Sequence, residues 1–298
     1  MLIAVVKKDV FVLRKKLIAI DMDGTLLSSD HEISNVNKKA IKDAQAAGHI
    51  VMICSGRAHD RVLITLEEEG LSGLPISASN GAIALVDEVI IDHICMARSA
   101  VETIYDWLDE FEYPFQIFTD NGFYRPEGFF ERAKYEFTTT ERVKHPHHHD
   151  LNKMIAYLKS APSTYINQSS DILATASLFK FYIYSPNMEK KAAAIEFAKS
   201  IGGLTITSSF EDNVEISDIK ANKGTGLKVI ANHFNIPMED TIAIGDNYND
   251  LGMLEVAGFS IAMGNADEGI KQLTDAVTLT NNEDGVAHAI EKYVLEMK

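Results

Sequence analysis

The sequence has little cysteine, a shortage of basic residues and no long apolar run. Only two cysteines, Cys54 and Cys95, occur in 298 residues, which argues against a disulfide framework and favours a reducing cytoplasm. No apolar run reaches the length of a membrane span. The opening MLIAVVKKDVFVL is interrupted by charge and lacks the layout of a signal peptide. We expect a cytoplasmic protein, and the role of its first fifteen residues stays open.

The shortage of positive charge narrows the possible partners. The chain has 28 basic and 43 acidic residues, a formal net charge of −15. This balance argues against a surface for nucleic acid or for an anionic membrane. A ligand that carries phosphate would have to be held by local positive charge. Hydrophobic residues make up 46% of the chain, which is enough for a sizeable core in one large or two ordinary domains.

Strand and helix patterns alternate at both ends of the chain. Near the start, the residues predict strands over 16–20 and 49–54, with a helix between them that Ser34 caps and that reaches Ala47. After Lys223, helix and strand patterns alternate again as far as the last helix, DGVAHAIEKYVLEM. Uninterrupted apolar strands that alternate with helices indicate an α/β fold with a parallel sheet covered on both faces.

The middle of the chain has a different pattern. FQIFTDNGFYR is typical of a hairpin, and FKFYIYS alternates as a half-exposed strand does. Longer strands and more aromatic residues indicate a separate α+β unit. We therefore predict one α/β domain built from residues 1–91 and 215–298, with an inserted α+β domain over 92–214.

Two carboxylates stand side by side in LIAIDMDGTLL. Residues two apart on a strand lie on one side, so Asp21 and Asp23 can both face the crevice at the carboxyl end of the first strand, where Gly24 lets the chain turn. An ordinary Asp-Gly turn with solvated acids is the alternative. A calcium loop would need glycine where Leu26 stands and a helix where the strand precedes it, although Glu32 has the right spacing.

Two further clusters carry anion-binding groups. In CSGRAHD, Ser55 and Gly56 precede a helix whose free N–H groups could hold an anion, and Arg57 adds a fixed charge. In ANKGTGL, Lys223 stands directly before a helix, where the helix dipole disfavours a cation, so it needs a counter-charge or a ligand. A capped turn and a solvated surface lysine are the ordinary alternatives.

The fourth cluster, AIGDNYNDLGML, again follows a buried strand. Asp246, Asn249 and Asp250 are spaced to meet at the first turn of a helix, and helix capping explains only one of them. All four clusters fall at the same kind of place, the end of a strand or the start of a helix. Acids combined with a hydroxyl, helix N–H groups and a lysine would bind a phosphate together with a hard divalent cation such as Mg²⁺.

These residues resemble a known family. DMDGTLL, SGR, NKGTGL and GDNYND are similar to the four ordered motifs of the haloacid dehalogenase-like (HAD) phosphohydrolases, and the wide gap after SGR resembles the Cof-type branch with its large α/β (C2-type) cap. The resemblance implies a Rossmann-like core and a cap that sets substrate specificity. It also implies Mg²⁺-dependent hydrolysis of small phosphate monoesters, with sugar phosphates as the family expectation. Asn222 stands where relatives often carry Ser.

The resemblance also implies a role for each motif residue. Asp21 would be the nucleophile that forms an aspartyl-phosphate, and Asp23 would be the general acid and base. Mg²⁺ would be held by the Asp21 carboxylate, the Asp23 backbone carbonyl and Asp246. Asp250 would orient Lys223 or a metal-bound water. The residues that would hold the phosphoryl oxygens are Ser55, Gly56, Lys223 and Asn249, with Thr25 and Arg57 in support.

Two other functions share these motifs. A phosphomutase would use the same nucleophile but would pass the phosphoryl group to a second hydroxyl, and a non-catalytic sensor of phosphosugar or Mg²⁺ would not need Asp23. The expected partner is a small phosphorylated metabolite, and the chain is expected to be a monomer or a dimer.

A run of histidines in the inserted unit stands apart from these motifs. KHPHHHD, with His147–His149, predicts a solvated loop in preference to a metal site, because the histidines lack a regular spacing. A contact with substrate is the other role left open.

Overall fold

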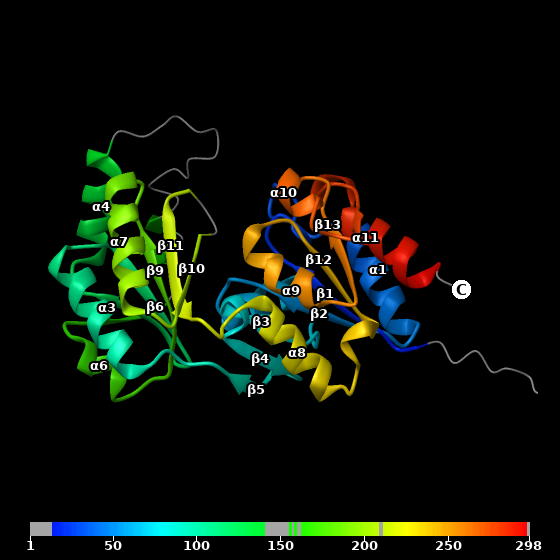
Figure 1. Cartoon of the computed structure of the whole chain (residues 1–298), viewed down its shortest axis with the longest axis horizontal. Coiled ribbons are helices and arrows are strands. Elements are labelled where there is room, and N and C mark those ends of the chain that lie inside the picture. The colour runs from blue at the N-terminus through cyan, green and yellow to red at the C-terminus, as the bar shows by residue number, and fades with distance from the viewer. Residues whose placement is uncertain (1–13, 141–154, 157, 160–161, 209–210, 297–298) are drawn as a thin grey trace, which may run out of the picture.

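The structure is a computed structural model that describes residues 14–140, 155–156, 158–159, 162–208 and 211–296. The histidine run and the first thirteen residues lie outside the described residues. Two lobes lie side by side, each built on its own sheet (Figure 1). Among the described residues, no helix has the length and apolar character that crossing a membrane requires.

The larger sheet has eight strands in the order β14-β13-β12-β1-β2-β3-β4-β5. Its strands are β1 Leu17–Asp21, β2 Ile50–Cys54, β3 Ile76–Ala78, β4 Ile83–Val86, β5 Val89–His93, β12 Thr241–Gly245, β13 Phe259–Ala262 and β14 Ala276–Val277. Pairing is parallel from β14 to β3 and antiparallel from β3 to β5. The predicted α/β fold with a parallel-sheet core is confirmed.

Alternate residues of β1 and β2 enter two hydrophobic cores, one on each face of this sheet. Ile18 and Ile20 lie in the core that also contains residues of three helices, α1 Asn35–Ala46, α2 His59–Glu68 and α11 Gly285–Ile290. Leu17 and Ala19 lie in the core shared with α8 Lys223–His233, α9 Leu251–Val256 and α10 Glu268–Lys271. Burial on both faces explains why these strands are continuous apolar runs. The Ser34 hydroxyl accepts a bond from the Asn37 N–H (3.0 Å), which confirms it as the cap of α1.

The second sheet has six strands in the order β10-β11-β9-β6-β7-β8, mostly antiparallel. The strands are β6 Phe115–Thr119, β7 Gly122–Pro126, β8 Ser163–Ile166, β9 Leu178–Tyr184, β10 Leu204–Thr207 and β11 Asn213–Asp218. The accompanying helices are α3 Arg98–Glu110, α4 Phe129–Thr139, α6 Ser169–Leu173 and α7 Met188–Ile201. The predicted hairpin is confirmed, because Thr119 pairs with Gly122.

At both predicted domain borders, the strand that precedes the border in one sheet continues a few residues past it. Residues 92–93 still belong to β5, where His93 pairs with Ile83, and residues 215–218 belong to β11, where Ser217 pairs with Lys180. In terms of sheet pairing, the eight-stranded sheet ends at residue 93 in this part of the chain and the six-stranded sheet ends at residue 218. The division of the chain into a core domain and a cap domain stays a prediction.

Candidate active site

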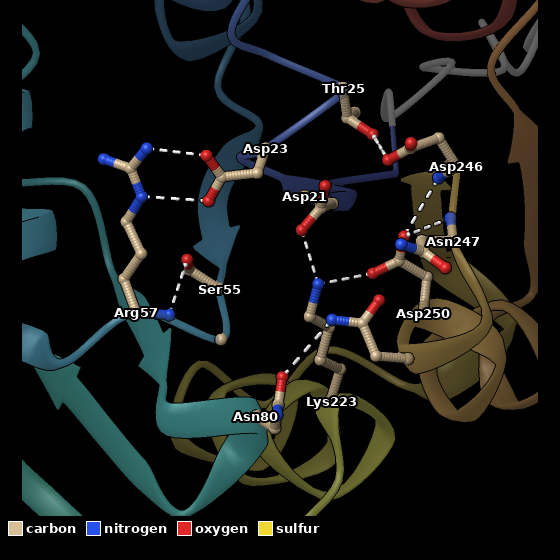
Figure 2. Close-up of polar contacts among 12 residues, drawn as sticks. Asp21, Asp23, Thr25, Ser55, Arg57, Asn80, Lys223, Asp246, Asn247 and Asp250 are labelled. Carbon is tan, nitrogen blue, oxygen red and sulfur yellow. Dashed lines mark hydrogen bonds and ion pairs between the residues drawn. The ribbon is translucent and has the colours of Figure 1, made fainter. Parts of the chain in front are cut away.

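All four sequence clusters meet at the carboxyl end of the parallel strands. β1 lies between β2 and β12, so the residues that follow these three strands share one edge of the sheet, and the start of α8 faces the same place (Figure 2). Short 3₁₀ turns carry several of the side chains, among them η1 Ser79–Gly81 after β3 and η3 Tyr248–Asp250 after β12. The other short 3₁₀ turns of the lobe are η2 Met238–Asp240 and η4 Asn281–Glu283, and a short π-helix, η5 Glu291–Leu295, follows α11.

A buried lysine joins two buried carboxylates at the centre of the site. The Lys223 ammonium group, on the first residue of α8, donates to Oδ1 of Asp21 and to Oδ1 of Asp250. Burial lowers the pKa of Lys223, but the charges of Asp21 and Asp250 outweigh it and raise the pKa above the usual lysine value. The counter-charge that a lysine at a helix N-terminus requires is therefore present, and it comes from two carboxylates.

The Asp21 carboxyl group is also strongly perturbed. Burial raises its pKa well above the ordinary aspartate value, the charge of Asp250 raises it further, and Lys223 acts in the opposite direction. The sequence places Asp21 at the last position of an entirely buried strand. A carboxylate so confined is costly unless positive charge accompanies it, and here the lysine supplies that charge.

Asp246 completes a cluster of carboxylates. One oxygen from each of Asp21, Asp246 and Asp250 lies within 4.8 Å of the other two. The Thr25 hydroxyl donates to Asp246 Oδ1 (2.8 Å). The preceding residue, Gly24, has φ +81°, and any residue with a Cβ at this position would place that Cβ only 2.4 Å from Asp246 Oδ2. Burial and then the charge of Asp250 raise the pKa of Asp246 to about 6.

The donor set of this cluster fits a divalent cation. Carboxylate oxygens are the ligands that Mg²⁺ prefers. Because Gly24 has no side chain, the Asp246 carboxylate can lie close to the turn after β1. Thr25, predicted as a supporting residue, orients Asp246. Two of the three predicted metal residues, Asp21 and Asp246, contribute carboxylates to the cluster, whereas the third carboxylate belongs to Asp250.

Asp23 points elsewhere. Its carboxylate accepts two bonds from the Arg57 guanidinium, from Nε at 2.9 Å and from Nη2 at 2.6 Å, and it lies outside the three-carboxylate cluster (Figure 2). The side chain of Asp23 is 40% exposed. The sequence suggested that Arg57 adds charge to an anion site, and in the structure its guanidinium group donates to this carboxylate. The predicted contact of the Asp23 backbone carbonyl with metal stays a prediction.

Asp250 serves two neighbours at once. Besides the bond to Lys223, its Oδ2 accepts from the backbone N–H groups of Asp246 (2.9 Å) and Asn247 (3.0 Å). The carboxylate therefore ties the loop after β12 to the start of α8. Of the two roles predicted for Asp250, orientation of Lys223 matches its geometry.

The predicted phosphate-binding residues surround the same place. The Ser55 hydroxyl accepts a bond from the Arg57 N–H (3.1 Å), and the Asn249 side-chain amide donates to Asn80 Oδ1 (3.4 Å). Gly56, in the loop after β2, lies against the turn after β3, because a Cβ at Gly56 would be 2.9 Å from Asn80 Oδ1.

Asn80 is a member of this site that the sequence analysis did not select. It has φ +55° in the turn after β3, next to Gly81, where a Cβ would lie 1.9 Å from the Asn222 carbonyl oxygen. The sequence signal was the Asn-Gly pair after a short apolar strand. That pair marks a turn, but only the sheet order places the turn beside Ser55 and Asn249.

Comparison with known proteins identifies the class. Residues 18–290 match the model of the haloacid dehalogenase-like hydrolase family, so the chain belongs to this family. Phosphatase YwpJ of Bacillus subtilis (strain 168) is 37% identical over 93% of this chain and 99% of its own length. The 5-amino-6-(5-phospho-D-ribitylamino)uracil phosphatase YwtE of the same organism is 33% identical over 93% and 97%.

The fold comparison agrees with the sequence comparison. The structure of a haloacid dehalogenase-like hydrolase from B. subtilis superposes with a TM-score of 0.80 at 36% identity, covering 94% of this chain and all of that one. The family match and the named relatives support a phosphatase of the hydrolase class.

Proposed function

We propose that this protein is a cytoplasmic, Mg²⁺-dependent phosphatase that hydrolyses small phosphate monoesters, with sugar phosphates as the substrate class, through a phosphorylated Asp21. The observation that carries the proposal is the convergence of three carboxylates and Lys223 beside the Ser55 turn. The six-stranded lobe would set specificity as the cap. The names of the relatives favour hydrolysis over the mutase alternative.

Mg²⁺ is proposed to be held by Asp21, Asp246 and the Asp23 backbone carbonyl, and when bound it would supply positive charge that screens the phosphate from the attacking carboxylate. Lys223 holds Asp21 through one carboxylate oxygen. This bond restricts the direction in which the other oxygen can attack phosphorus. Lys223 and the polar groups of Ser55, Gly56 and Asn249 would stabilise the charge of the transferring group.

The proposed reaction has two balanced steps. In the first, an Asp21 oxygen forms a bond to phosphorus while the bond to the leaving oxygen breaks, and Asp23 gives that oxygen a proton. In the second, the oxygen of a water molecule forms a bond to phosphorus while the bond between phosphorus and the Asp21 oxygen breaks, and Asp23 takes a proton from the water, so inorganic phosphate and free Asp21 result. The Arg57 guanidinium, which donates to both oxygens of Asp23, would orient this carboxyl group for proton transfer.

The test is phosphate release by the purified full chain. We expect turnover of an aryl phosphate and of several sugar phosphates when MgCl₂ is present, and loss of that turnover in excess chelator, restored by added Mg²⁺. A coupled assay for inorganic phosphate measures both. Undiminished turnover in excess chelator would contradict the proposed dependence on Mg²⁺. Absence of turnover for every phosphate monoester would contradict the proposed phosphatase activity.

Protons and Mg²⁺ are expected to compete for the carboxylate cluster. Because the pKa of Asp246 is raised to about 6, the metal-free protein holds a proton there below about pH 6, and Mg²⁺ must displace it. The affinity for Mg²⁺ should fall as the pH drops through about 6, by roughly tenfold per pH unit for one displaced proton. Calorimetric titration with MgCl₂ at several pH values measures this directly.

The same shift gives the sign of a stability effect. A raised carboxyl pKa stabilises the folded metal-free protein at low pH, and this contribution is lost as the pH rises through about 6. Mg²⁺ should therefore raise the melting temperature more at about pH 7.5 than at about pH 5. Asp246→Asn should reduce this difference, whereas Asp43→Asn, at an exposed aspartate paired with Lys39, should keep it. An equal Mg²⁺ effect at both pH values in the unaltered protein would contradict the competition.

A further inference from the structure

A buried ion pair of the six-stranded lobe lies against the candidate phosphate site. Lys180 on β9 and Glu215 on β11 are bonded at 2.8 Å, and their side chains are 1% and 2% exposed. Nothing in the proposed reaction uses either residue. Such a pair is costly to bury unless further hydrogen bonds complete it, and here several of those bonds reach into the other lobe.

Lys180 contacts the loop that carries Ser55. Its ammonium group donates to the Gly56 carbonyl oxygen (2.6 Å). The N–H of that same peptide group belongs to Arg57 and donates to the Ser55 hydroxyl (3.1 Å). Because a peptide group is planar, a bond that fixes its carbonyl also fixes the N–H on the opposite side. Lys180 thereby orients the Ser55 hydroxyl from the neighbouring lobe.

Glu215 contacts the other side of the site. Its Oε2 accepts from the Asn80 side-chain amide (2.9 Å), whose Oδ1 in turn accepts from the Asn249 amide (3.4 Å). Asn213 donates to the second Glu215 oxygen (3.1 Å). The Asn80 turn and the Ser55 loop are also bonded to each other, because Asn80 N–H donates to the Ser55 carbonyl (3.0 Å).

Apolar contact excludes water around this junction. Lys180 lies over the Phe118 ring, 4.4 Å from its centroid. Phe118 and Phe123 of the six-stranded lobe pack with Ala58, which follows Arg57 directly in the chain. Separation of the lobes would expose this contact and break the bonds of Lys180 and Glu215 to Gly56 and Asn80 together.

We propose that the Lys180–Glu215 pair is a positioning element for the phosphate site: it docks the six-stranded lobe on the loops after β2 and β3 and thereby holds Ser55 and Asn249 for phosphoryl oxygens. This inference rests on the proposed function. Docking of the lobes and binding of phosphate then favour each other, because each requires the same arrangement of the two loops.

The decisive variant is Lys180→Met/Glu215→Leu, which removes both charges and leaves no unpaired buried ion. We expect KM for an aryl phosphate and the inhibition constant of inorganic phosphate to rise about tenfold, the scale of one lost bond to a charged group, with a smaller change in kcat. The matched control is Lys190→Met/Glu136→Leu, which removes another lysine–glutamate pair (3.0 Å) of the same lobe; among the described residues, the hydrogen bonds of this pair stay within that lobe. The control should keep both constants.

A second variant tests the inference if the first variant does not fold. Asn80→Gly keeps the ion pair and suits the positive φ of this position, but it disconnects Glu215 from Asn249. The inhibition constant of inorganic phosphate should rise by about threefold, because the bonds of the Asn80 side chain to Glu215 and Asn249 are lost while Lys180 keeps its bond to Gly56. Wild-type constants in both variants would overturn the inference while leaving the proposed function intact.

Hydrogen exchange separates this inference from the function. The amide of Arg57 and that of Asn80 should exchange faster in Lys180→Met/Glu215→Leu than in the unaltered chain or the control. If the unaltered chain hydrolyses no phosphate ester but these amides respond and calorimetry shows weaker binding of inorganic phosphate, the positioning role stands and the proposed function fails. Unchanged exchange and unchanged affinity for inorganic phosphate overturn the positioning role.

Discussion

Asp21→Asn is expected to abolish turnover and to leave the fold intact. A neutral amide cannot attack phosphorus, and loss of a nucleophile costs roughly 10⁴-fold or more in kcat. The fold should persist because Lys223 keeps Asp250 as its counter-charge, so no unpaired ammonium remains buried. The measurement is kcat/KM for an aryl phosphate, with circular dichroism and thermal unfolding to verify the fold.

A matched substitution controls for the change from carboxylate to amide. Asp43→Asn, at the exposed end of α1, should retain full activity. Mass spectrometry should verify that the amide at position 21 has not reverted to aspartate. Full activity in a folded, verified Asp21→Asn protein would show that Asp21 is not the nucleophile.

Asp23→Asn is expected to separate the two steps of the reaction. The amide cannot give a proton to a poor leaving group or take one from water, so turnover of an alkyl phosphate should fall by roughly 10²- to 10⁴-fold. An aryl phosphate has a leaving group that needs less protonation and should suffer less in the first step. Rapid mixing should then show a burst of aryl alcohol, and acid quenching should trap labelled phosphate on Asp21.

The ion pair of Asp23 with Arg57 provides the control for this variant. Arg57→Met breaks the same pair but keeps the Asp23 carboxylate, so phospho-enzyme should not accumulate. Accumulation in Asp23→Asn alone assigns the loss to proton transfer. If both variants lose alkyl and aryl turnover equally and neither traps phosphate, Asp23 acts only through its contact with Arg57, and the division of roles is wrong.

Much of this site followed from local sequence patterns. An apolar strand that ends in polar residues identifies a position at the sheet edge: Asp21 is the last residue of β1, and Ser55 and Asp246 directly follow β2 and β12. The parallel order of β2, β1 and β12 then brings these ends together. The need of Lys223 for a counter-charge was also evident, because it stands at the unfavourable end of a helix dipole.

Other features depended on contacts between distant segments. The sequence could not indicate that Asp23 turns toward Arg57, because the direction of each side chain depends on how two loops meet. The alternation of FKFYIYS indicated a half-exposed strand, yet Lys180 is buried because the other lobe covers it. Asn80 belonged to an unremarkable turn until the sheet order placed it beside Asn249.

The position of β1 in the sheet has a consequence for synthesis of the chain. This buried strand pairs with β2 on one side and with β12 on the other, and β12 begins only at Thr241. Because the N-terminal segment leaves the ribosome first, β1 keeps an open edge of unpaired backbone groups while about two hundred further residues are made. The six-stranded lobe is complete in sequence by Asp218 and can form during that interval. One edge of β1 therefore stays unpaired in the nascent chain until β12 has been synthesised. A fragment that ends before β12 would expose this edge, which could pair with another copy of the chain.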